Sequence, residues 1–462
     1  MTRRRVLAPC WLLLLTQVAA CQTATAPADS KAEALSRFDF REVIAGAKDK
    51  VFPAVVYIKC LRQSHESGKK QTQEVTGSGV IIAENGLVLS NWHVVDKATE
   101  VRCLLFGGRA YEAEIAGTDK DLDLALLRLK LDANTKPLPF AEIGNSDKLK
   151  EGDFVMAMGA PWGLSRSVSI GIISCTRRYL PKNSEYSLWL QTDAAISPGN
   201  SGGPLVDTDG KVIGINTRGM TSGGDMGFAV PSKVIGQILP RLKEHGNVKW
   251  SWTGLVLQPI RDFNKNVYFK GTEGVIIASV DPDSPAQKAG IENQDRILSI
   301  NGRPTNGLTE EELPNIRRQI ALLPLDEPAT VKLLRDGKEM TLKLTPRQKG
   351  SVEGKELDCP RWDLAVKTIN QFDNPQLYFY RKKGVFIYGT KRPGNAALAG
   401  LARNDILLKI GKEKVTSLED VKRIHKKLVD NVDKKHKVLF TVLRNGLMRQ
   451  VILDYQRDFE RE

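Results

Sequence analysis

The stretch "ISPGNSGGPLVD", Ile196–Asp207, places a single serine, Ser201, among glycines in a chain of 462 residues. A flexible turn is the simplest interpretation, because glycine adopts backbone conformations that other residues rarely reach. A catalytic turn is the alternative: a nucleophile that the substrate approaches closely, beside backbone N–H groups that point at a developing negative charge. The surrounding sequence distinguishes these two interpretations.

Short apolar runs separated by turn residues extend on both sides of this turn. They include "GSGVIIAENGLVLSN", "GDFVMAMGAP", "VSIGIISC" and "KVIGINT". Asn85-Gly86 between two such runs is a hairpin signal, and many short strands are typical of an antiparallel barrel or sandwich. We therefore expect a mainly β domain of about 180 residues. A helix over 39–52 and a strand over 54–60 should precede it, and a helix over 232–246 should follow.

A histidine and an acid precede the serine in the order of a catalytic triad. His93 follows the strand-like run "GLVLSN", and "DKDLDLALLRL" supplies aspartates at positions 119, 121 and 123. Serine catalysis needs a base within hydrogen-bond reach and an acid that orients the base. Each residue alone is compatible with a structural role. Their joint occurrence in the order His, Asp, Ser is that of chymotrypsin-type enzymes.

These motifs together resemble the HtrA/Deg family of serine proteases. The matching segments are "TGSGVII…LVLSNWHVV", "DLDLALLRL", "GAPWGL…VSIGIIS" and "QTDAAISPGNSGGPLVD…VIGINT…GFAVP". The resemblance implies a mainly β chain: a chymotrypsin-like double β-barrel protease domain followed by two PDZ-like α+β domains. It also implies a serine endopeptidase with His93, Asp123 and Ser201 as its catalytic triad. Asp123 is the expected acid, since the family's aspartate precedes an aliphatic residue and alanine. Asp119 and Asp121 are then expected to be solvated at the entry of a strand.

The resemblance extends to the groups that bind the substrate. It implies that the N–H groups of Gly199 and Ser201 form the oxyanion hole, and that Ala195 lines the base of the S1 pocket. Ala195 offers no charge to a lysine or arginine at P1, so we expect small or medium aliphatic P1 residues. We also expect Ile215, Asn216 and Thr217 to line the S1 pocket.

The last 200 residues contain an internal repeat. Residues 284–300, "SPAQKAGIENQDRILSI", match residues 394–410, "GNAALAGLARNDILLKI", and "VKLLRDGK" matches "FTVLRNGL" further on. Two tandem units of about 100 residues follow from this ordered match. The units resemble PDZ domains, which capture a C-terminal carboxylate and add the peptide as a strand. Thr253, Gly254 and Leu255 are the candidate peptide-binding loop of the first unit. The second has "RWDLAV" (361–366) without the glycine, which leaves peptide binding, assembly or surface contact open.

The N-terminus has the features of an export signal. "MTRRR" precedes an apolar run that ends in Val18-Ala19-Ala20-Cys21. This ending resembles a lipobox, with Cys21 as the lipidated residue; an ordinary signal-peptidase site near Ala20 is the alternative. We expect an exported protein in the periplasm or cell envelope, anchored to the membrane through Cys21. The expected divisions are a signal peptide (1–20), a tether (21–37), a protease domain (38–248), PDZ domains (249–346 and 359–456) and a linker (347–358).

Net charge and cysteine content restrict which other ligands and partners the sequence suggests. The net charge is +14, and the region from Cys359 onward holds 22 Lys and Arg against 12 Asp and Glu. A solvated basic face explains this excess most simply, an anionic membrane surface is the alternative, and no motif for nucleic acid is present. Neither cysteine nor histidine spacing indicates a metal site, and no cofactor is expected. Cys60 and Cys103 could form a disulfide or remain buried thiols.

The leading hypothesis is a serine endopeptidase that degrades or processes misfolded or exported proteins of the cell envelope. Its expected partners are unfolded or C-terminal segments of protein substrates, with PDZ domains that bind peptide C-termini or regulate activity. The resemblance implies a homotrimer or larger assembly, with Phe38 and Phe40 as candidate contact residues. The alternative is a non-proteolytic peptide-binding chaperone or scaffold.

Overall fold

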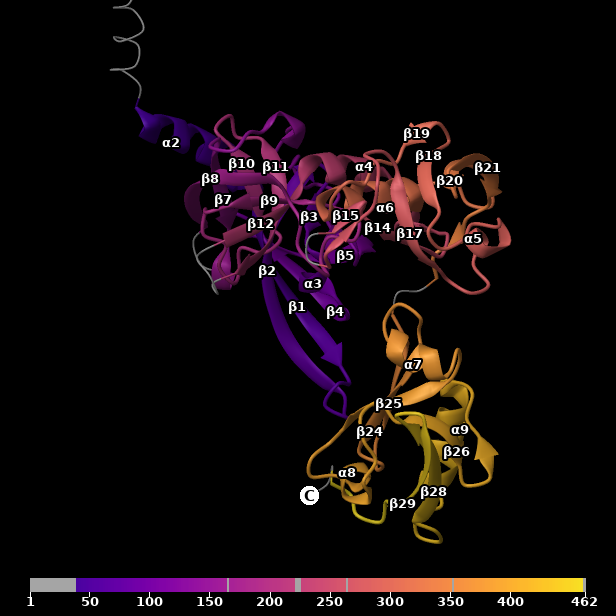
Figure 1. Ribbon diagram of the computed structural model, residues 1–462. Helices are drawn as coiled ribbons and strands as arrows, with labels where there is room; N and C mark the ends of the chain where they lie inside the picture. The colour runs from indigo at the N-terminus through magenta and orange to yellow at the C-terminus, as the bar shows by residue number, and fades with distance from the viewer. Residues whose placement is uncertain (1–38, 164–165, 221–225, 263–264, 351–352, 460–462) are drawn as a thin grey trace, which may run out of the picture.

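The computed structural model describes residues 39–163, 166–220, 226–262, 265–350 and 353–459 (Figure 1). The expected signal peptide, the tether with Cys21, and Phe38 lie outside these residues. The described chain forms two β-barrels followed by two α+β domains, so the predicted fold class is confirmed. None of the helices in the described part is long and apolar enough to cross a membrane.

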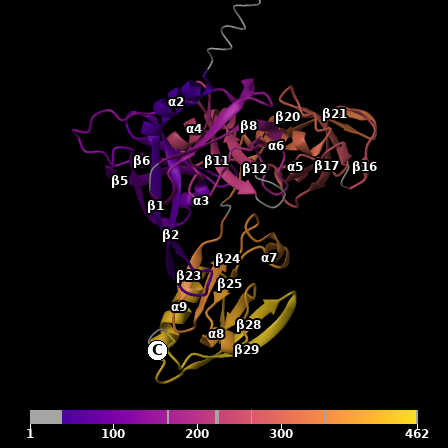
Figure 2. The same ribbon diagram turned by 90° about the vertical axis from the view of Figure 1, so that its left-hand side faces the viewer.

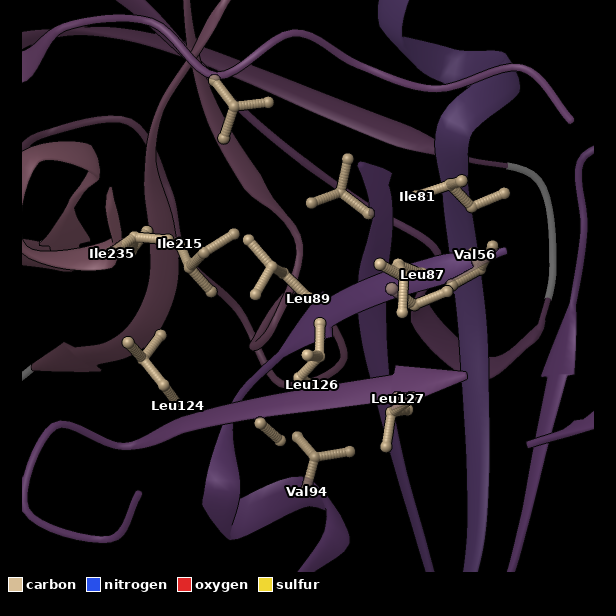
Figure 3. Close-up of a cluster of buried hydrophobic side chains, with 14 of the residues drawn as sticks. Val56, Ile81, Leu87, Leu89, Val94, Leu124, Leu126, Leu127, Ile215 and Ile235 are labelled. Atoms are coloured by element: carbon tan, nitrogen blue, oxygen red, sulfur yellow. The ribbon is translucent and has the colours of Figure 1, made fainter. Parts of the chain in front are cut away.

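The first barrel closes in the strand order β1-β2-β3-β6-β5-β4. Its alternating apolar residues turn inward and meet in a buried cluster shared with the second barrel (Figure 3). The helix α2 (Phe40–Val51) precedes the barrel, as predicted, and Asp39 caps it by accepting a hydrogen bond from the Arg41 N–H. The strands are β1 (Val55–Ser64), β2 (Gln71–Ala83), β3 (Leu87–Ser90), β4 (Ala98–Leu104), β5 (Ala110–Asp119) and β6 (Leu124–Leu129).

The second barrel closes in the order β10-β11-β12-β9-β8-β7. The helix α4 (Ser232–His245) follows it and ends at Gly246, whose φ of +70° is the left-handed conformation that glycine adopts readily after a helix. The predicted helix over 232–246 is thereby confirmed. The strands are β7 (Phe154–Gly159), β8 (Ser167–Arg178), β9 (Trp189–Thr192), β10 (Pro204–Asp207), β11 (Val212–Met220) and β12 (Met226–Pro231).

The two C-terminal domains repeat one topology. The first orders its sheet β14-β17-β18-β20-β21, and the second orders β24-β25-β26-β28-β29 in the same way. The bounds in the first are β14 (Leu255–Gln258), β17 (Val275–Val280), α5 (Pro285–Lys288), β18 (Arg296–Ile300), α6 (Leu313–Ala321), β20 (Ala329–Arg335) and β21 (Lys338–Leu344). Those in the second are β24 (Leu364–Thr368), β25 (Val385–Thr390), α8 (Asn395–Ala399), β26 (Ile406–Ile410), α9 (Leu418–Val429), β28 (Lys437–Arg444) and β29 (Leu447–Asp454).

The sequence repeat is matched by a repeated ion pair. In the first domain Arg335 contacts the buried Asp295 carboxylate at 2.7 Å and donates to the Gly290 carbonyl. In the second domain Arg444 contacts Asp405 at 2.6 Å and donates to the Gly400 carbonyl. Since a buried carboxylate needs a charged partner, each domain holds the loop before its central strand with its own arginine.

The segment predicted as a linker is structured at both ends. It contains β22 (Arg347–Gln348), which pairs with β13 (Ser251–Trp252), and β23 (Glu356–Cys359), which pairs with β24. The long β1–β2 hairpin leaves the first barrel and reaches the second C-terminal domain, where α8 and β25 lie (Figures 1 and 2).

The cysteines in the described residues are free thiols. Cys60 on β1 and Cys103 on β4 are both buried, and the register pairs Cys103 with Ile58. Burial raises the pKa of the Cys60 thiol to about 12, so this thiol stays protonated at neutral pH. Of the two states left open by the sequence, the structure has the buried thiols.

Candidate active site

His93 and Asp123 are brought together at the end of the first barrel. His93 lies on the short helix α3 (Trp92–Val95) after β3, and Asp123 lies in the tight turn before β6 with a φ of +54°. The carboxylate contacts His93 Nδ1 at 2.8 Å and accepts a hydrogen bond from the His93 backbone N–H at 3.0 Å. This leaves Nε2 as the nitrogen available to a nucleophile.

Buried neighbours fix the positions of these two residues. Val94, directly after His93, and Leu124, directly after Asp123, both belong to the apolar cluster of Figure 3. Asn91, fully buried, adds a polar anchor, since its Nδ2 donates to the Asp123 carbonyl at 2.9 Å and to Thr217 Oγ1 at 3.1 Å. Asn91 thus connects the acid to the second barrel, a role that its place in "LSNWHVV" did not reveal.

Ser201 lies on the loop between β9 and β10, facing the first barrel. Its backbone carbonyl accepts a hydrogen bond from the Ser78 N–H at 2.8 Å. Its hydroxyl donates to the Thr217 carbonyl at 3.0 Å. The hydrogen bonds therefore run from His93 to Asp123, Asn91, Thr217 and Ser201, with the nucleophile's hydroxyl engaged by a carbonyl.

The glycines of this loop permit a backbone that other residues would obstruct. Gly199 has a φ of +101°, and a Cβ there would lie 2.7 Å from the Pro161 Cα. Gly202 has a φ of +85°, and a Cβ there would lie 2.2 Å from the Ser78 carbonyl oxygen. Within the described residues, no hydrogen bond engages the N–H of Gly199 or of Ser201. Two donors on one turn, open to a ligand, are what an oxyanion hole requires.

Ser78 supports this turn from the first barrel, and sequence reasoning did not single it out. Its hydroxyl donates to the Gly199 carbonyl at 2.6 Å and accepts from the Ala160 N–H at 2.8 Å. The side chain is completely buried. Ser78 thereby fixes the Gly199–Asn200 peptide, which lies between the two peptides that carry the Gly199 and Ser201 N–H groups. The signal was present in "TGSGVII", where a serine sits between two glycines at the start of an apolar run.

The predicted S1 residues lie around the same loop in different environments. Ala195 is exposed, with its carbonyl accepting from Ser169 Oγ at 2.6 Å. Ile215 and Asn216 are fully buried within the barrel, so their side chains do not face solvent. Thr217 is buried too, and its carbonyl contacts Ser201.

Ile196 narrows the space beside Ala195. A Cβ at Gly227 would lie 2.8 Å from Ile196 Cδ1, and a Cβ at Gly219 would lie 2.5 Å from the Ile196 carbonyl oxygen. The Ile196 side chain therefore packs directly against the backbone of β12. This places an apolar side chain beside Ala195, which the sequence motifs did not indicate.

The expectation that Asp119 is solvated is wrong. Asp119 is 5% exposed and accepts hydrogen bonds from Trp250 Nε1 at 2.6 Å and from the Leu122 N–H at 2.8 Å. Burial raises its pKa to about 7, with the neighbouring Asp121 as a further cause. Asp121 is not simply solvated either, since it pairs with Lys349 at 2.8 Å. Both partners come from distant parts of the chain, which local alternation cannot anticipate.

The candidate peptide-binding loop of the first C-terminal domain borders a cavity of about 150 Å³. Thr253, Gly254 and Leu255 line it together with Ile320 and Ala321 of α6. Gly254 has a φ of +78°, and a Cβ there would overlap Ser284. No strand in the described part of the chain pairs with the outer edge of β14, which is the arrangement that a strand-adding peptide needs.

Comparisons with known proteins agree with this architecture. A family model described as a trypsin-like peptidase domain matches residues 77–215, and one described as a PDZ domain matches residues 236–345. A probable periplasmic serine endoprotease, DegP-like, of Marinomonas sp. (strain MWYL1) is 37% identical over 378 residues, 80% of this chain and 77% of that protein. The protein of the same description from Chlamydia muridarum is 32% identical, over 83% of this chain and 75% of its own length.

Solved structures show the same relation. The HtrA-type protease AlgW with a tripeptide superposes with a TM-score of 0.58 at 31% identity, covering 66% of this chain and 97% of that one. A serine endoprotease from Yersinia pestis gives a TM-score of 0.51 at 31% identity, with 66% and 98% covered. With 37% of its residues identical across most of a DegP-like enzyme, and a trypsin-like region ahead of a PDZ region, the chain belongs to the HtrA/DegP family of serine endopeptidases.

Proposed function

We propose that this endopeptidase cleaves unfolded or exported proteins in the periplasm, with Ser201 as nucleophile, His93 as base and Asp123 as the orienting acid. The observation that carries the proposal is the His93–Asp123 pair at 2.8 Å, joined through Asn91 and Thr217 to the Ser201 loop. The relatives from Marinomonas and Chlamydia are described as periplasmic, which supports the compartment.

The first chemical step begins with an exchange of hydrogen bonds. Ser201 Oγ leaves the Thr217 carbonyl and donates to His93 Nε2, which takes the proton as Oγ attacks the scissile carbonyl carbon. The N–H groups of Gly199 and Ser201 hold the resulting oxyanion. His93 then returns the proton to the leaving amine, and water hydrolyses the acyl-enzyme by the same steps in reverse order. Asp123 keeps Nδ1 protonated throughout and stabilises the imidazolium.

The proposed P1 preference is for small or medium aliphatic residues. Ala195 carries no charge, and the apolar Ile196 packs against Gly227, so neither residue offers a charged partner to a P1 side chain. A lysine or arginine at P1 would lose its hydration without gaining a partner, which is costly for an ionised group. The buried Ile215 and Asn216 and the neighbouring Thr217 would contribute only their main chain to the pocket walls.

We propose further that Thr253, Gly254 and Leu255 bind the C-terminal carboxylate of a peptide that lies along β14. Anchoring at Cys21 and assembly into a trimer or larger complex are proposed from the family resemblance alone. Phe40 packs against Phe154 of its own chain, with ring centroids 4.7 Å apart and ring planes inclined at 53°, and Phe154 remains 51% exposed for a neighbouring subunit. Mass spectrometry of the mature N-terminus tests the anchor, since an unmodified Cys21 refutes it.

Cleavage of unfolded casein tests the proteolytic function. Ser201→Ala should abolish it, while Ser197→Ala, an exposed serine of the same loop, should leave it within about twofold. Each assay should be repeated with a hydrophobic peptide that has a free C-terminus, in case the first PDZ domain controls activity. Casein binding without serine-dependent cleavage in either condition would replace the protease with the chaperone or scaffold alternative.

A further inference from the structure

The second C-terminal domain differs from the first at the edge of its sheet. Among the residues that the structure describes, β14 of the first domain pairs with β17 alone, and the cavity beside Gly254 lies along its other edge. In the second domain the equivalent strand, β24, pairs on that edge with β23 (Glu356–Cys359), in antiparallel register. An antiparallel strand laid between the edge strand and the long helix is the position a peptide takes in a PDZ domain.

The residues of β23 face two ways, as those of a bound peptide would. Leu357 and Cys359 turn inward, and Cys359 is fully buried in a cluster with Trp362 of the turn that follows β23 and with Val421 and Ile424 of α9. Directly after β23, the Pro360 carbonyl contacts His425 Nε2 on α9. The space between β24 and α9 is therefore filled by the chain's own side chains.

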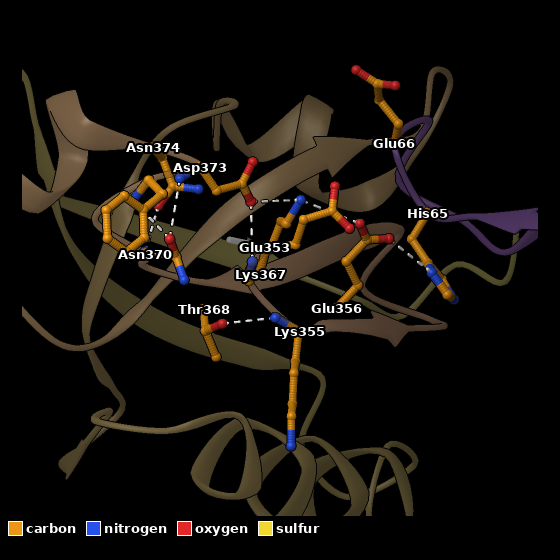
Figure 4. A network of polar contacts seen from close by, with 12 residues as sticks. His65, Glu66, Glu353, Lys355, Glu356, Lys367, Thr368, Asn370, Asp373 and Asn374 are labelled. Carbon is orange, nitrogen blue, oxygen red and sulfur yellow. Dashed lines mark hydrogen bonds and ion pairs between the residues drawn. The ribbon is translucent and has the colours of Figure 1, made fainter. Parts of the chain in front are cut away.

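The opposite face of β23 holds the protease domain. Glu356, with a side chain 9% exposed, contacts Lys97 at 2.6 Å and His65 at 3.3 Å, and also its cross-strand neighbour Lys367 at 3.5 Å (Figure 4). Asp358 accepts a hydrogen bond from the Lys70 N–H at 3.1 Å. His65 and Lys70 belong to the tip of the β1–β2 hairpin, so β23 joins the two domains.

The hairpin tip also packs against β25 of the second domain. A Cβ on Gly68 would lie 2.4 Å from the Lys391 backbone nitrogen, and a Cβ on Gly389 would lie 2.1 Å from the Glu66 carbonyl oxygen. Glu66 pairs with Arg403 at 2.8 Å on the rim of this contact. Two glycines that allow backbone to meet backbone indicate a close-packed contact rather than a loose one.

The loop that would receive a peptide carboxylate is altered as well. Asp363 takes the place of Gly254 in the repeat, with a φ of +55° against +78° for the glycine. Its carboxylate accepts from the Asn395 N–H at 2.9 Å and lies 3.7 Å from Lys391 Nζ. An acid at this position repels a C-terminal carboxylate, whereas the backbone of the first domain can receive one.

We propose that the peptide groove of the second domain is occupied in cis by residues 356–359, and that the domain serves to hold the β1–β2 hairpin rather than to capture free peptide ends. The ligand of this groove is an extended internal segment with two apolar side chains inward and two acids outward. Removing this segment would also remove Glu356 from Lys97 and His65. The proposal does not depend on proteolysis, so it is tested in the full-length chain carrying Ser201→Ala.

Peptide binding gives the first test. A fluorescein-labelled decapeptide with an apolar, free C-terminus should bind once per chain, and Gly254→Asp should weaken binding at least tenfold with no residual site. Binding in the Gly254→Asp variant within threefold of the unsubstituted affinity would overturn the proposal. That result would mean that the second groove accepts free ends.

The labelling rate of Cys359 reports directly whether β23 stays in the groove. In the unsubstituted chain, N-ethylmaleimide should modify Cys359 as slowly as Cys103, since both are fully buried. Leu357→Ser should speed modification of Cys359 at least tenfold while Cys103 stays slow. Cys359 labelling in the unsubstituted chain as fast as that of the partly exposed Cys175 would overturn the proposal.

A gentler variant separates strand release from unfolding of the domain. Glu356→Gln keeps the side-chain volume and the pairing with β24 but weakens the ionic contacts with Lys97 and His65. Amide exchange over residues 65–70 should accelerate at least fivefold, while Cys359 remains protected. Unchanged exchange at the hairpin tip would show that β23 does not hold it and would overturn that part of the proposal.

Discussion

Replacing Ser78 with alanine tests whether a buried hydroxyl in the first barrel aligns the proposed oxyanion hole on the second. The Ser78 hydroxyl donates to the Gly199 carbonyl at 2.6 Å and accepts from the Ala160 N–H at 2.8 Å. A hydrogen bond of this kind contributes about 1 kcal/mol, and leaving a buried partner unsatisfied costs about 1–3 kcal/mol. The free energy of unfolding should therefore fall by about 2–4 kcal/mol.

The catalytic effect should be smaller than the loss of an oxyanion donor, because the Gly199 N–H remains in place. Removing such a donor costs about 3 kcal/mol of barrier. Loss of the hydrogen bond from Ser78 to the Gly199 carbonyl should raise the activation barrier by about 1–2 kcal/mol, which lowers kcat about fivefold to thirtyfold with little change in KM. Steady-state cleavage of a peptide substrate, measured well below the unfolding temperature, separates this effect from loss of folded enzyme.

Ser232 provides a matched control for this substitution. It is also a buried serine with two backbone partners, accepting from the Ser146 N–H at 3.0 Å and donating to the Gly144 carbonyl at 2.9 Å. Ser232→Ala should lose a similar amount of stability but keep kcat. The reasoning fails if Ser78→Ala retains kcat within twofold, or if Ser232→Ala lowers kcat equally.

Two further predictions concern Asp119 and Ala195. Burial in the folded state raises the pKa of Asp119 to about 7. The folded chain therefore binds the Asp119 proton more tightly than the unfolded chain does, so the free energy of unfolding falls as pH rises from about 4 to 7. In urea unfolding, the free energy of unfolding of the parent chain should fall by about 2–3 kcal/mol between pH 5 and pH 8 relative to that of Asp119→Asn. The same dependence on pH in both proteins would contradict this. Ala195→Asp should raise cleavage after lysine or arginine at least tenfold over cleavage after valine in matched peptides, because it supplies the missing charge. An unchanged ratio would place Ala195 outside the S1 pocket.

The sequence was sufficient to predict that His93 and Asp123 lie together, because each residue sits in a short motif next to a strand. His93 and Asp123 each precede a residue of the core, so the pattern that folds the barrel also brings the two side chains together. Ser78 and Asn91 were missed because their partners, Gly199 and Thr217, lie 121 and 126 residues away. The local sequence does not predict contacts between residues so far apart in the chain.

Asp119 and β23 are two further features that the sequence alone did not predict correctly. The alternation at positions 119 and 121 indicated a common face, but Trp250, 131 residues later, buries one of these carboxylates. The segment 347–358 is polar and contains glycine, which favours a linker, and a four-residue strand is too short to be recognised alone. What makes it a strand is its antiparallel pairing with β24, together with the contacts of Glu356 and Asp358 to the β1–β2 hairpin about 290 residues earlier.

The β1–β2 hairpin also ties the position of the distal domain to the first barrel. Tyr57–Arg62 of β1 pair with β4 inside the barrel wall, while the turn at 65–70 contacts β23 and β25. The same two strands therefore belong both to the barrel and to the contact with the distal domain. A change in the twist of this hairpin would shift the barrel wall and the distal domain together.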